Sequence, residues 1–267
     1  MKTKIVYPNN FLLKEVIQYF LFITKSDNEI ITQLCYPNTN HCLSIIKEGE
    51  MMEVNKNEYH ILPSTKNSSY LTGIYKQPIK INAKQPYQEL CINFNPMGLE
   101  SIFGVNFSQT IFKNNVLSEN KNWSPLFEIV FSNNSLEIIQ NEIESFFISL
   151  LHDEMFSNSL LFNKTLKANQ IEEINDLLCK SYRSTHRYFV NQLQTTPKEY
   201  LQIQKVREAM PLILKDIALI EIAYSLNFTD QSHFIKTFKK YTNRTPSQFK
   251  QTSSQVDNML IWNLNNT

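Results

Sequence analysis

An internal repeat constrains this chain more than any other feature of its sequence. A shift of 49 residues aligns the stretch that begins near residue 170 with the stretch that ends near residue 250, without a gap. The matched pairs are Glu172 with Glu221, Leu177 with Leu226, Arg187 with Lys236, Phe189 with Phe238, Thr196 with Thr245, Pro197 with Pro246 and Tyr200 with Phe249. A period of this length indicates a supersecondary unit that occurs twice.

Each copy has the pattern of two helices joined by a short turn. Apolar residues recur at helical spacing, and the predicted core positions are Ile171, Ile174, Leu177, Leu178, Phe189 and Leu193 in the first copy and Leu219, Ile222, Ala223, Leu226, Phe234 and Phe238 in the second. Ser181 can cap the second helix of the first copy, and Thr229 or Asp230 that of the second. Asn227 suits the left-handed end of a helix. The pattern predicts two helix-turn-helix motifs, whose second helices fit the major groove of DNA.

The outward faces of these second helices, about residues 181–193 and 230–241, carry side chains that can read bases. The candidate DNA-binding residues are Arg183, His186 and Arg187 in the first helix and Gln231, Ser232, His233, Lys236 and Lys239 in the second. Arginine can donate two hydrogen bonds to guanine, and glutamine can pair in the same way with adenine. The alternative is an ordinary solvated helix face, which explains any one of these residues better than the whole duplicated set.

Charge is distributed unevenly along the chain, although the total is only +1. Residues 165–250 contain 13 lysines and arginines against 8 aspartates and glutamates, a formal charge of +5, and the remainder carries −4. All the arginines lie in this basic part, namely Arg183, Arg187, Arg207 and Arg244. Because arginine is suited to phosphate and base recognition, the distribution favours a nucleic-acid partner for the C-terminal part.

A further helix is predicted between the two copies. Thr196 can cap it, and Pro197 suits its first position. Its apolar side carries Tyr200, Leu201, Ile203, Val206, Ala209 and Ile213. From residue 197 to 213 the helix would span about 25 Å, which could set two reading helices into major-groove segments about 34 Å apart. Pro211 is expected to kink or weaken its last turn.

These residues resemble the DNA-binding domain of AraC/XylS-type transcriptional regulators. The resemblance rests on residues 181–189 (SYRSTHRYF), 196–201 (TPKEYL), 221–228 (EIAYSLNF), 231–234 (QSHF) and 245–249 (TPSQF). It implies a homeodomain-like fold whose two motifs read adjacent segments of a promoter, with the candidate residues facing bases or phosphates. It also implies transcription regulation, with an activator role and contact with RNA polymerase as expectations, although the sequence does not separate activation from repression.

The sequence departs from that family pattern at several positions. Gln194, Asn227 and Asn243 stand where glycines are usual, and asparagine keeps the turn chemistry better than glutamine does. Thr185 replaces a usual leucine, and Lys205 a usual arginine. We expect the changes at Thr185 and Lys205 to affect the packing of the first copy, and Gln194 to be the less comfortable of the glycine replacements.

The N-terminal part is predicted to be rich in β-structure. A short helix leading into a strand is expected over residues 11–24, and apolar segments between turn residues predict strands at 42–47, 50–54, 59–62, 70–75, 79–81 and 88–94. The run Lys47-Glu48-Gly49-Glu50 predicts a tight hairpin turn. Many short strands at close spacing suggest a small barrel or sandwich.

Helical segments are expected after the sheet, up to Phe103, from Trp123 to Phe131 and over residues 136–151. The run 95–100, continued by Gly104 and Val105, resembles the jelly-roll-like sensor segment often found ahead of AraC-type modules. That resemblance implies a cupin-like domain that senses something or pairs subunits.

The helix at 136–151 has a broad apolar face, formed by Leu136, Ile139, Ile143, Phe146, Phe147, Leu150 and Leu151. This face either packs inside the chain or forms the interface of a homodimer. An apolar stripe alone does not separate these two interpretations.

Nothing in the sequence predicts catalysis, a metal site or a cofactor. His41 and His60 are isolated and do not form the histidine cluster of a metal-dependent cupin. A nucleophile elbow and a glycine-rich phosphate loop are both lacking. The cysteines are expected to be buried free thiols, with a redox-sensing pair as the alternative; they are Cys35, Cys42, Cys91 and Cys179.

The sequence contains no run of about 18 apolar residues that would predict a membrane span. Its N-terminus lacks the pattern of a signal peptide. We therefore expect a cytoplasmic protein with no membrane partner.

Together these observations predict an α+β chain. A small β-barrel or cupin-like sensor domain (1–120) is followed by a helical dimerisation or linker segment (121–164), an all-α double helix-turn-helix domain (165–252) and a tail (253–267). The expected function is sequence-specific binding of double-stranded promoter DNA, modulated by a small-molecule effector or by dimerisation. Two alternatives remain open. One is a non-specific architectural DNA binder. The other is a ligand-binding or enzymatic sheet domain that works without DNA or uses the helical part only as a tether to DNA.

Overall fold

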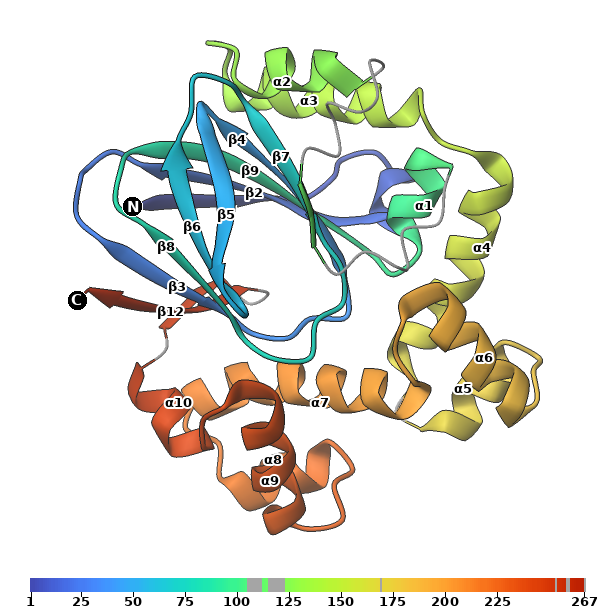
Figure 1. Cartoon of the computed structure of the whole chain (residues 1–267). Coiled ribbons are helices and arrows are strands. Elements are labelled where there is room, and N and C mark those ends of the chain that lie inside the picture. Colours follow the sequence, from blue (N-terminus) through green and yellow to red (C-terminus); the bar gives the residue numbers. More distant parts are fainter. Residues whose placement is uncertain (105–111, 115–122, 169, 253, 258–259, 267) are drawn as a thin grey trace.

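The computed structural model describes the chain apart from residues 105–111, 115–122, 169, 253, 258–259 and 267. Two six-stranded sheets form its N-terminal part (Figure 1). In spatial order, the first sheet contains β1 (Lys2–Val6), β2 (Ile17–Lys25), β9 (Tyr87–Phe94), β4 (His41–Lys47), β7 (Ser68–Thr72) and β10 (Phe112–Asn114). The second contains β11 (Ser254–Asp257), β12 (Leu260–Asn266), β3 (Ile31–Cys35), β8 (Ile79–Ala83), β6 (Glu58–Pro63) and β5 (Gly49–Asn55).

Along the chain one short helix precedes β2, one follows β9, and the other described helices lie between β10 and β11. Those of the first part are η1 (Leu13–Glu15), α1 (Gly98–Phe103), α2 (Ser124–Val130), α3 (Leu136–Ile148), α4 (Asp153–Asn163) and η3 (Lys164–Lys167). The C-terminal helices are α5 (Ile171–Leu177), α6 (Tyr182–Leu193), α7 (Pro197–Leu214), α8 (Leu219–Ser225), α9 (Gln231–Thr242) and α10 (Pro246–Thr252). The predicted α+β class is confirmed, but the strands form two sheets that do not close into one barrel.

The predicted hairpin at Gly49 is wrong, although a tight turn is present there. Glu48 has a φ of 45°, so the chain reverses sharply between β4 and β5. However, β4 pairs with β7 and β9, whereas β5 pairs with β6 in the other sheet. A Cβ atom at Gly49 would lie 2.7 Å from the Ile46 side chain. The glycine therefore allows the chain to cross between the sheets in a single turn.

Strand β2 shows how the first sheet separates two hydrophobic cores. Side chains alternate between the faces of a strand, and Phe20 lies in a core with the apolar residues of α1 to α3. Its neighbours Tyr19 and Leu21 instead contribute to a second core shared with the other sheet. Helices therefore cover one face of the first sheet, and the second sheet covers the other.

The apolar face of α3 packs inside the chain. Ile139, Ile143 and Phe147 are buried in the core under the first sheet. Ile138 lies on the outer side of the helix and is half-exposed. This packing accounts for the stripe without a second subunit, so the sequence stripe does not by itself support a dimer.

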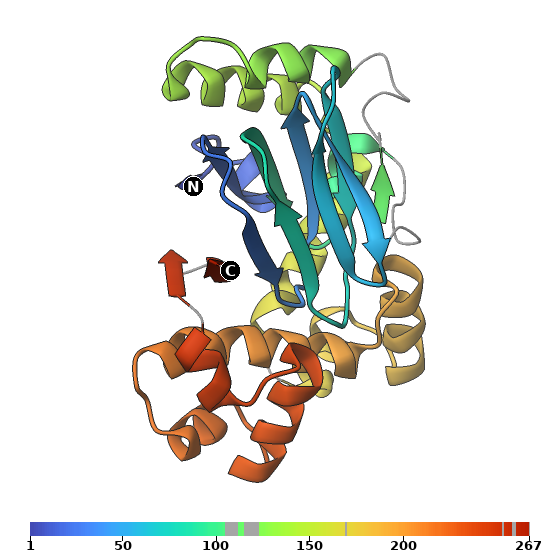
Figure 2. The ribbon, with the colours of Figure 1, turned by 60° about the vertical axis from the view of Figure 1, so that its left-hand side comes forward.

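Helix α7 runs along the end of the sheets opposite to α2 and α3 (Figures 1 and 2). The pair α5–α6 lies at one end of α7, and α8 to α10 lie at the other (Figure 1). The core of this helical part also includes Tyr36, Ile74 and Met97 from the N-terminal part. An apolar interface of this kind favours a fixed domain arrangement.

The end of the chain returns to the sheets. Strand β12 pairs antiparallel with β3, so Asn263 lies opposite Leu34. Met259, Val105 and the expected boundary at residues 120–121 lie outside the described residues.

Candidate nucleic-acid interface

The repeat in the sequence is reproduced in the structure. Helices α6 and α9 each contain 12 residues, and they begin 49 residues apart, at Tyr182 and Gln231. Both end at a residue in the left-handed conformation, Gln194 with φ 52° and Asn243 with φ 57°. Two copies of one unit therefore present two second helices of equal length.

Side chains at the N-termini fix where these two helices start. The Ser181 hydroxyl accepts a hydrogen bond from the Ser184 backbone N–H at 3.4 Å. Asp230 rather than Thr229 caps α9, because its carboxylate accepts from the His233 N–H at 2.8 Å. Each cap stabilises its helix by about 1 kcal/mol. The caps also fix the residue at which each helix begins and therefore which side chains face outward.

The inner sides of the units are closely packed, as the sequence predicted. Phe189, Phe234 and Phe238 are fully buried, and Phe189 packs edge-on against Tyr200 of α7 at 5.4 Å between ring centroids. Leu177 is the exception, because 41% of its surface is exposed. Helix α5 is short, and its neighbours Ile174 and Leu178 take the inward positions.

The structure places the eight candidate DNA-binding residues on the outer faces of α6 and α9. Six of them are exposed, namely Arg183, Arg187, Ser232, His233, Lys236 and Lys239. His186 and Gln231 are partly buried. The His233 ring stands edge-on to Phe228 at 5.5 Å, which limits the directions in which it can point.

Helix α7 joins the two units and contacts both. A capping box starts it, in which Thr196 and Glu199 exchange side-chain to backbone hydrogen bonds. Lys205 donates to the Asn227 carbonyl at 3.1 Å, at the turn between α8 and α9. Pro211 does not end the helix, which continues to Leu214. The expected weakening of the last turn therefore does not interrupt the connection.

A buried cavity, which sequence analysis did not predict, lies between the two sheets. Its volume is about 110 Å³. The first sheet supplies Tyr19, Leu21 and Glu89, and the second supplies Gln33 and Met51, among others. Arg207 of α7 completes the lining from the helical part. Among the described residues it is the one positively charged side chain in this wall, so the cavity borders both parts of the chain.

Glu89 is the acidic group of this cavity. The hydroxyl of Tyr70 and the thiol of Cys91, the latter at 3.1 Å, donate hydrogen bonds to the same carboxylate oxygen. Burial raises the pKa of Glu89, and these hydrogen bonds oppose the rise. Burial likewise raises the pKa of Tyr19, where the charge of Arg207 acts in the opposite direction. The lining of this mainly apolar cavity therefore includes one basic side chain, Arg207, and one carboxyl group, Glu89.

Three of the four cysteines line the cavity, and the fourth does not. A hydrogen bond with Cys42 and burial raise the pKa of the Cys91 thiol, and burial raises that of Cys35 to about 12. Thiols with such pKa values stay protonated near neutral pH and are poor nucleophiles. Cys91 is buried, Cys35 and Cys42 are partly buried and Cys179 is exposed, so the expectation that all four thiols are buried holds fully only for Cys91.

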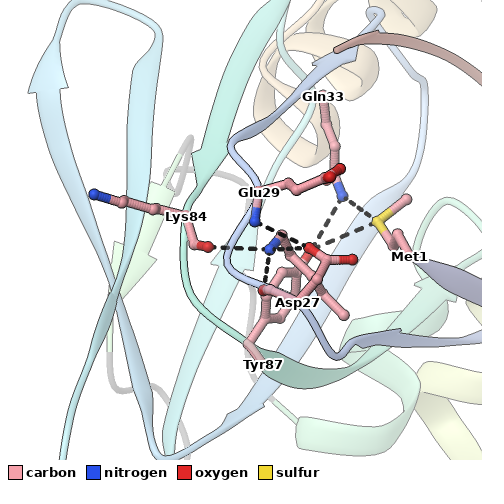
Figure 3. Close-up of polar contacts among 7 residues, drawn as sticks. Met1, Asp27, Glu29, Gln33, Lys84 and Tyr87 are labelled. Carbon is pink, nitrogen blue, oxygen red and sulfur yellow. Dashed lines mark hydrogen bonds and ion pairs between the residues drawn. The ribbon is translucent and has the colours of Figure 1, made fainter. Parts of the chain in front are cut away.

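A polar network lies beside the cavity, next to Gln33 (Figure 3). The Gln33 amide donates to the Tyr87 hydroxyl at 3.0 Å and to the sulfur of Met1 at 3.1 Å. The buried Lys25 ammonium donates to the Lys84 carbonyl at 3.0 Å and to the Asp27 carboxylate at 2.7 Å. These bonds satisfy a buried charge that would otherwise be costly.

The described residues contain neither a metal-binding cluster nor a membrane-spanning helix. Within them, no three histidine, cysteine, aspartate or glutamate side chains gather as a metal ion would require. None of the helices in the described part of the chain is both long enough and apolar enough to cross a membrane.

Comparisons with known proteins agree with the geometry of the helical part. A family model described as a helix-turn-helix domain matches residues 175–252. An uncharacterised HTH-type transcriptional regulator from Pseudoalteromonas carrageenovora is 29% identical over 102 residues, which cover 36% of this chain and 59% of that protein. The chain thus spans about three fifths of the length of this relative.

A second relative is matched over most of its length. The probable transcription factor PqrA from Proteus vulgaris is 30% identical over 96 residues, which cover 34% of this chain and 79% of that protein. Among solved structures, ToxT from Vibrio cholerae is similar at a TM-score of 0.46 and 16% identity, over 87% of this chain and 97% of ToxT. Another such structure is of ToxT bound to an unsaturated fatty acid, with a TM-score of 0.44 and 16% identity, over 86% of this chain and 94% of ToxT.

The duplicated unit agrees with both the family model and the match to PqrA. Transcription regulators of this type are not a class of enzymes. By its paired helix-turn-helix motifs and these relatives, the chain belongs to the AraC-type family of transcriptional regulators.

Proposed function

We propose that this protein binds double-stranded promoter DNA in a sequence-specific manner, with α6 and α9 as its two reading helices. The observation that carries the proposal is the duplication: two helices of 12 residues with equivalent caps and exposed basic faces are attached to one continuous helix. A non-specific binder requires positive charge but has no need of two equivalent reading helices.

Different roles follow from the chemistry of the exposed side chains. Arg183 and Arg187 read guanine through paired hydrogen bonds, and Gln231 reads adenine. His186, Ser232 and His233 contact neighbouring base edges or phosphates. Lys236 and Lys239 hold phosphates, which adds affinity without sequence preference. Helix α9 therefore combines base reading with phosphate contacts from two lysines, which fix its register on the DNA.

The connecting helix matches the geometry of successive major-groove segments. Helix α7 contains 18 residues and spans about 27 Å. Segments of B-DNA that face the same side lie about 34 Å apart. With a reading helix packed beside each end of α7, both helices can reach one face of the duplex.

The cavity between the sheets is the proposed effector site. A cavity of about 110 Å³ is somewhat smaller than the engineered cavity of about 150 Å³ that holds benzene. The site therefore fits a compact molecule with about one small ring. Because Arg207 belongs to α7 and also lines the cavity, an effector there would touch the helix that joins the reading units. Dimerisation and contact with RNA polymerase remain proposals that follow from the family.

Selection of bound sequences from a random DNA pool tests the proposal. Purified full-length protein at near-physiological salt should enrich two short elements about one helical turn apart. A pool that stays random while the protein still binds DNA tightly would favour the architectural alternative. No binding at all, with or without a screen of small effectors, would contradict the proposal.

A further inference from the structure

Two loops of the sheet domain connect the cavity to the second reading unit. They are residues 36–40, between β3 and β4, and residues 73–78, between β7 and β8. Tyr36 and Tyr75 line the cavity, one from each loop. The Tyr75 hydroxyl donates a hydrogen bond to the Tyr36 carbonyl at 2.8 Å, which joins the loops to each other.

The same loops bind the second reading unit on their other side. The Tyr36 ring packs edge-on against Phe249 of α10, with 5.3 Å between centroids. The Gln77 amide donates to the Lys240 carbonyl of α9 at 3.2 Å. Lys76 also forms a 2.8 Å ion pair with Glu199 of α7. The loops therefore form a clamp on the helices behind the reading face.

A short series of packed rings leads from this clamp to the reading helix. Phe249 lies 5.4 Å from Phe238 of α9, and both are fully buried. Lys236 and Lys239 are exposed on the outer side of the same helix. Because buried rings in a dense core transmit displacement, a shift of Tyr36 reaches α9 through two ring contacts.

We propose that Tyr36 and Tyr75 are positioning residues that couple occupancy of the cavity to the placement of α9 and α10. This inference rests on the effector role proposed above. A compact ligand between the sheets pushes on the cavity side of the two loops, and the clamp passes the displacement to the second reading unit. The first unit is packed on α4 through Phe162 and Phe189, and the loops approach it through Tyr200 of α7, which is hydrogen-bonded to Thr39. Effector binding therefore acts on the second unit through direct loop contacts and on the first unit through α7.

A double-mutant cycle tests the coupling in the full-length protein without a known ligand. Leu21→Phe adds volume to the cavity from β2, a strand that is not continuous with either loop. Tyr75→Phe keeps the ring and removes the hydrogen bond to the Tyr36 carbonyl. Hydrogen exchange of the amides in α9 and α10 is measured in the wild type, in each single variant and in the double variant, and separate thermal melts establish that each is folded.

The expected result is non-additive. Leu21→Phe changes exchange in α9 and α10 by at least about threefold, and this change disappears in the Tyr75→Phe background, as for residues that couple through contact. Phe20→Leu, on the opposite face of the same strand, serves as the matched control and leaves exchange there unchanged. Ile81→Phe fills the cavity from the other sheet if Leu21→Phe does not fold.

An equal change in both backgrounds would overturn the coupling, as would no change in either filled variant. The affinity of the same variants for the selected duplex should follow the exchange data. If the random pool yields no consensus, the proposed function fails at that step. The hydrogen-exchange measurement needs no DNA, so it tests the coupling through the two loops independently of the proposed DNA-binding function.

Discussion

Thr185 is poorly accommodated in the first reading unit. Its side chain is fully buried, and its hydroxyl has no hydrogen-bond partner among the described residues. A buried hydroxyl without a partner lowers stability by about 1–3 kcal/mol. The sequence pointed to this position, because a threonine stands there in place of the usual leucine.

Thr185→Val should therefore stabilise the protein, because valine keeps the shape and removes the hydroxyl. We expect a gain of about 1 kcal/mol in the free energy of unfolding, measured by chemical denaturation. Thr242→Val is the matched control, since the Thr242 hydroxyl donates to the Phe238 carbonyl at 2.7 Å. That substitution should destabilise, and a gain at both positions would contradict the explanation.

His41 links stability to pH. It is buried, and burial lowers its pKa from 6.5 to about 4. Between these values the unfolded chain binds a proton that the folded chain does not, so stability falls as the pH falls. His41→Gln should remove roughly 3 kcal/mol of the stability loss between pH 7 and pH 4. If the stability of the variant and of the wild type falls equally between pH 7 and pH 4, His41 is not responsible for this pH dependence.

Arg187 and Lys239 separate base reading from phosphate contact. Arg187→Ala should cost about 1–3 kcal/mol and relax specificity at one base pair of the selected site. Lys239→Ala should weaken binding to all sequences and flatten the dependence on salt. Fluorescence anisotropy with matched and single-mismatch duplexes distinguishes the two. Equal losses on every duplex for Arg187→Ala would remove its reading role.

At the scale of elements, the helix ends follow from local chemistry. The left-handed conformation at Gln194, with φ 52°, costs about 1 kcal/mol in a residue with a Cβ atom, and asparagine tolerates it better than glutamine. Gln194→Gly should therefore raise the melting temperature by more than Asn243→Gly does. A larger gain at Asn243, or a loss at Gln194, would contradict this account of the helix ends.

The strands and helices predicted from the sequence were those with a strong local pattern. The segments predicted at 42–47, 59–62 and 88–94 lie within β4, β6 and β9, because alternation and turn residues bracket each one. Strands β1, β3, β10, β11 and β12 were missed. They are short or polar, and β12 gains its structure from β3, a partner strand far away in the chain.

The two candidate sites differ in the same way. The outer faces of α6 and α9 could be predicted from the sequence, because residues on one helix face recur at fixed spacing. The cavity could not, since its lining combines β2, β3, β9 and Arg207 of α7, which only the tertiary fold brings together. No local pattern in the sequence indicated which kind of ligand the cavity could hold.

In the whole molecule, the two proposed reading units are expected to act together on one duplex. Both units pack on α7, which continues past Pro211. The sheet domain adds contacts at Glu199 and Lys240. A connection of this kind limits the distance and the angle between α6 and α9 to a narrow range, so the spacing of the two DNA elements should matter as much as their sequence.

The most direct measurement is the affinity of the full-length protein for the selected duplex with an insertion of half a helical turn between its two elements. The insertion moves one element to the opposite face of the DNA. We expect a loss of at least about tenfold, equivalent to about 1.4 kcal/mol, down to the affinity for a duplex with one element alone. An unchanged affinity would show that the units bind independently and would contradict the account.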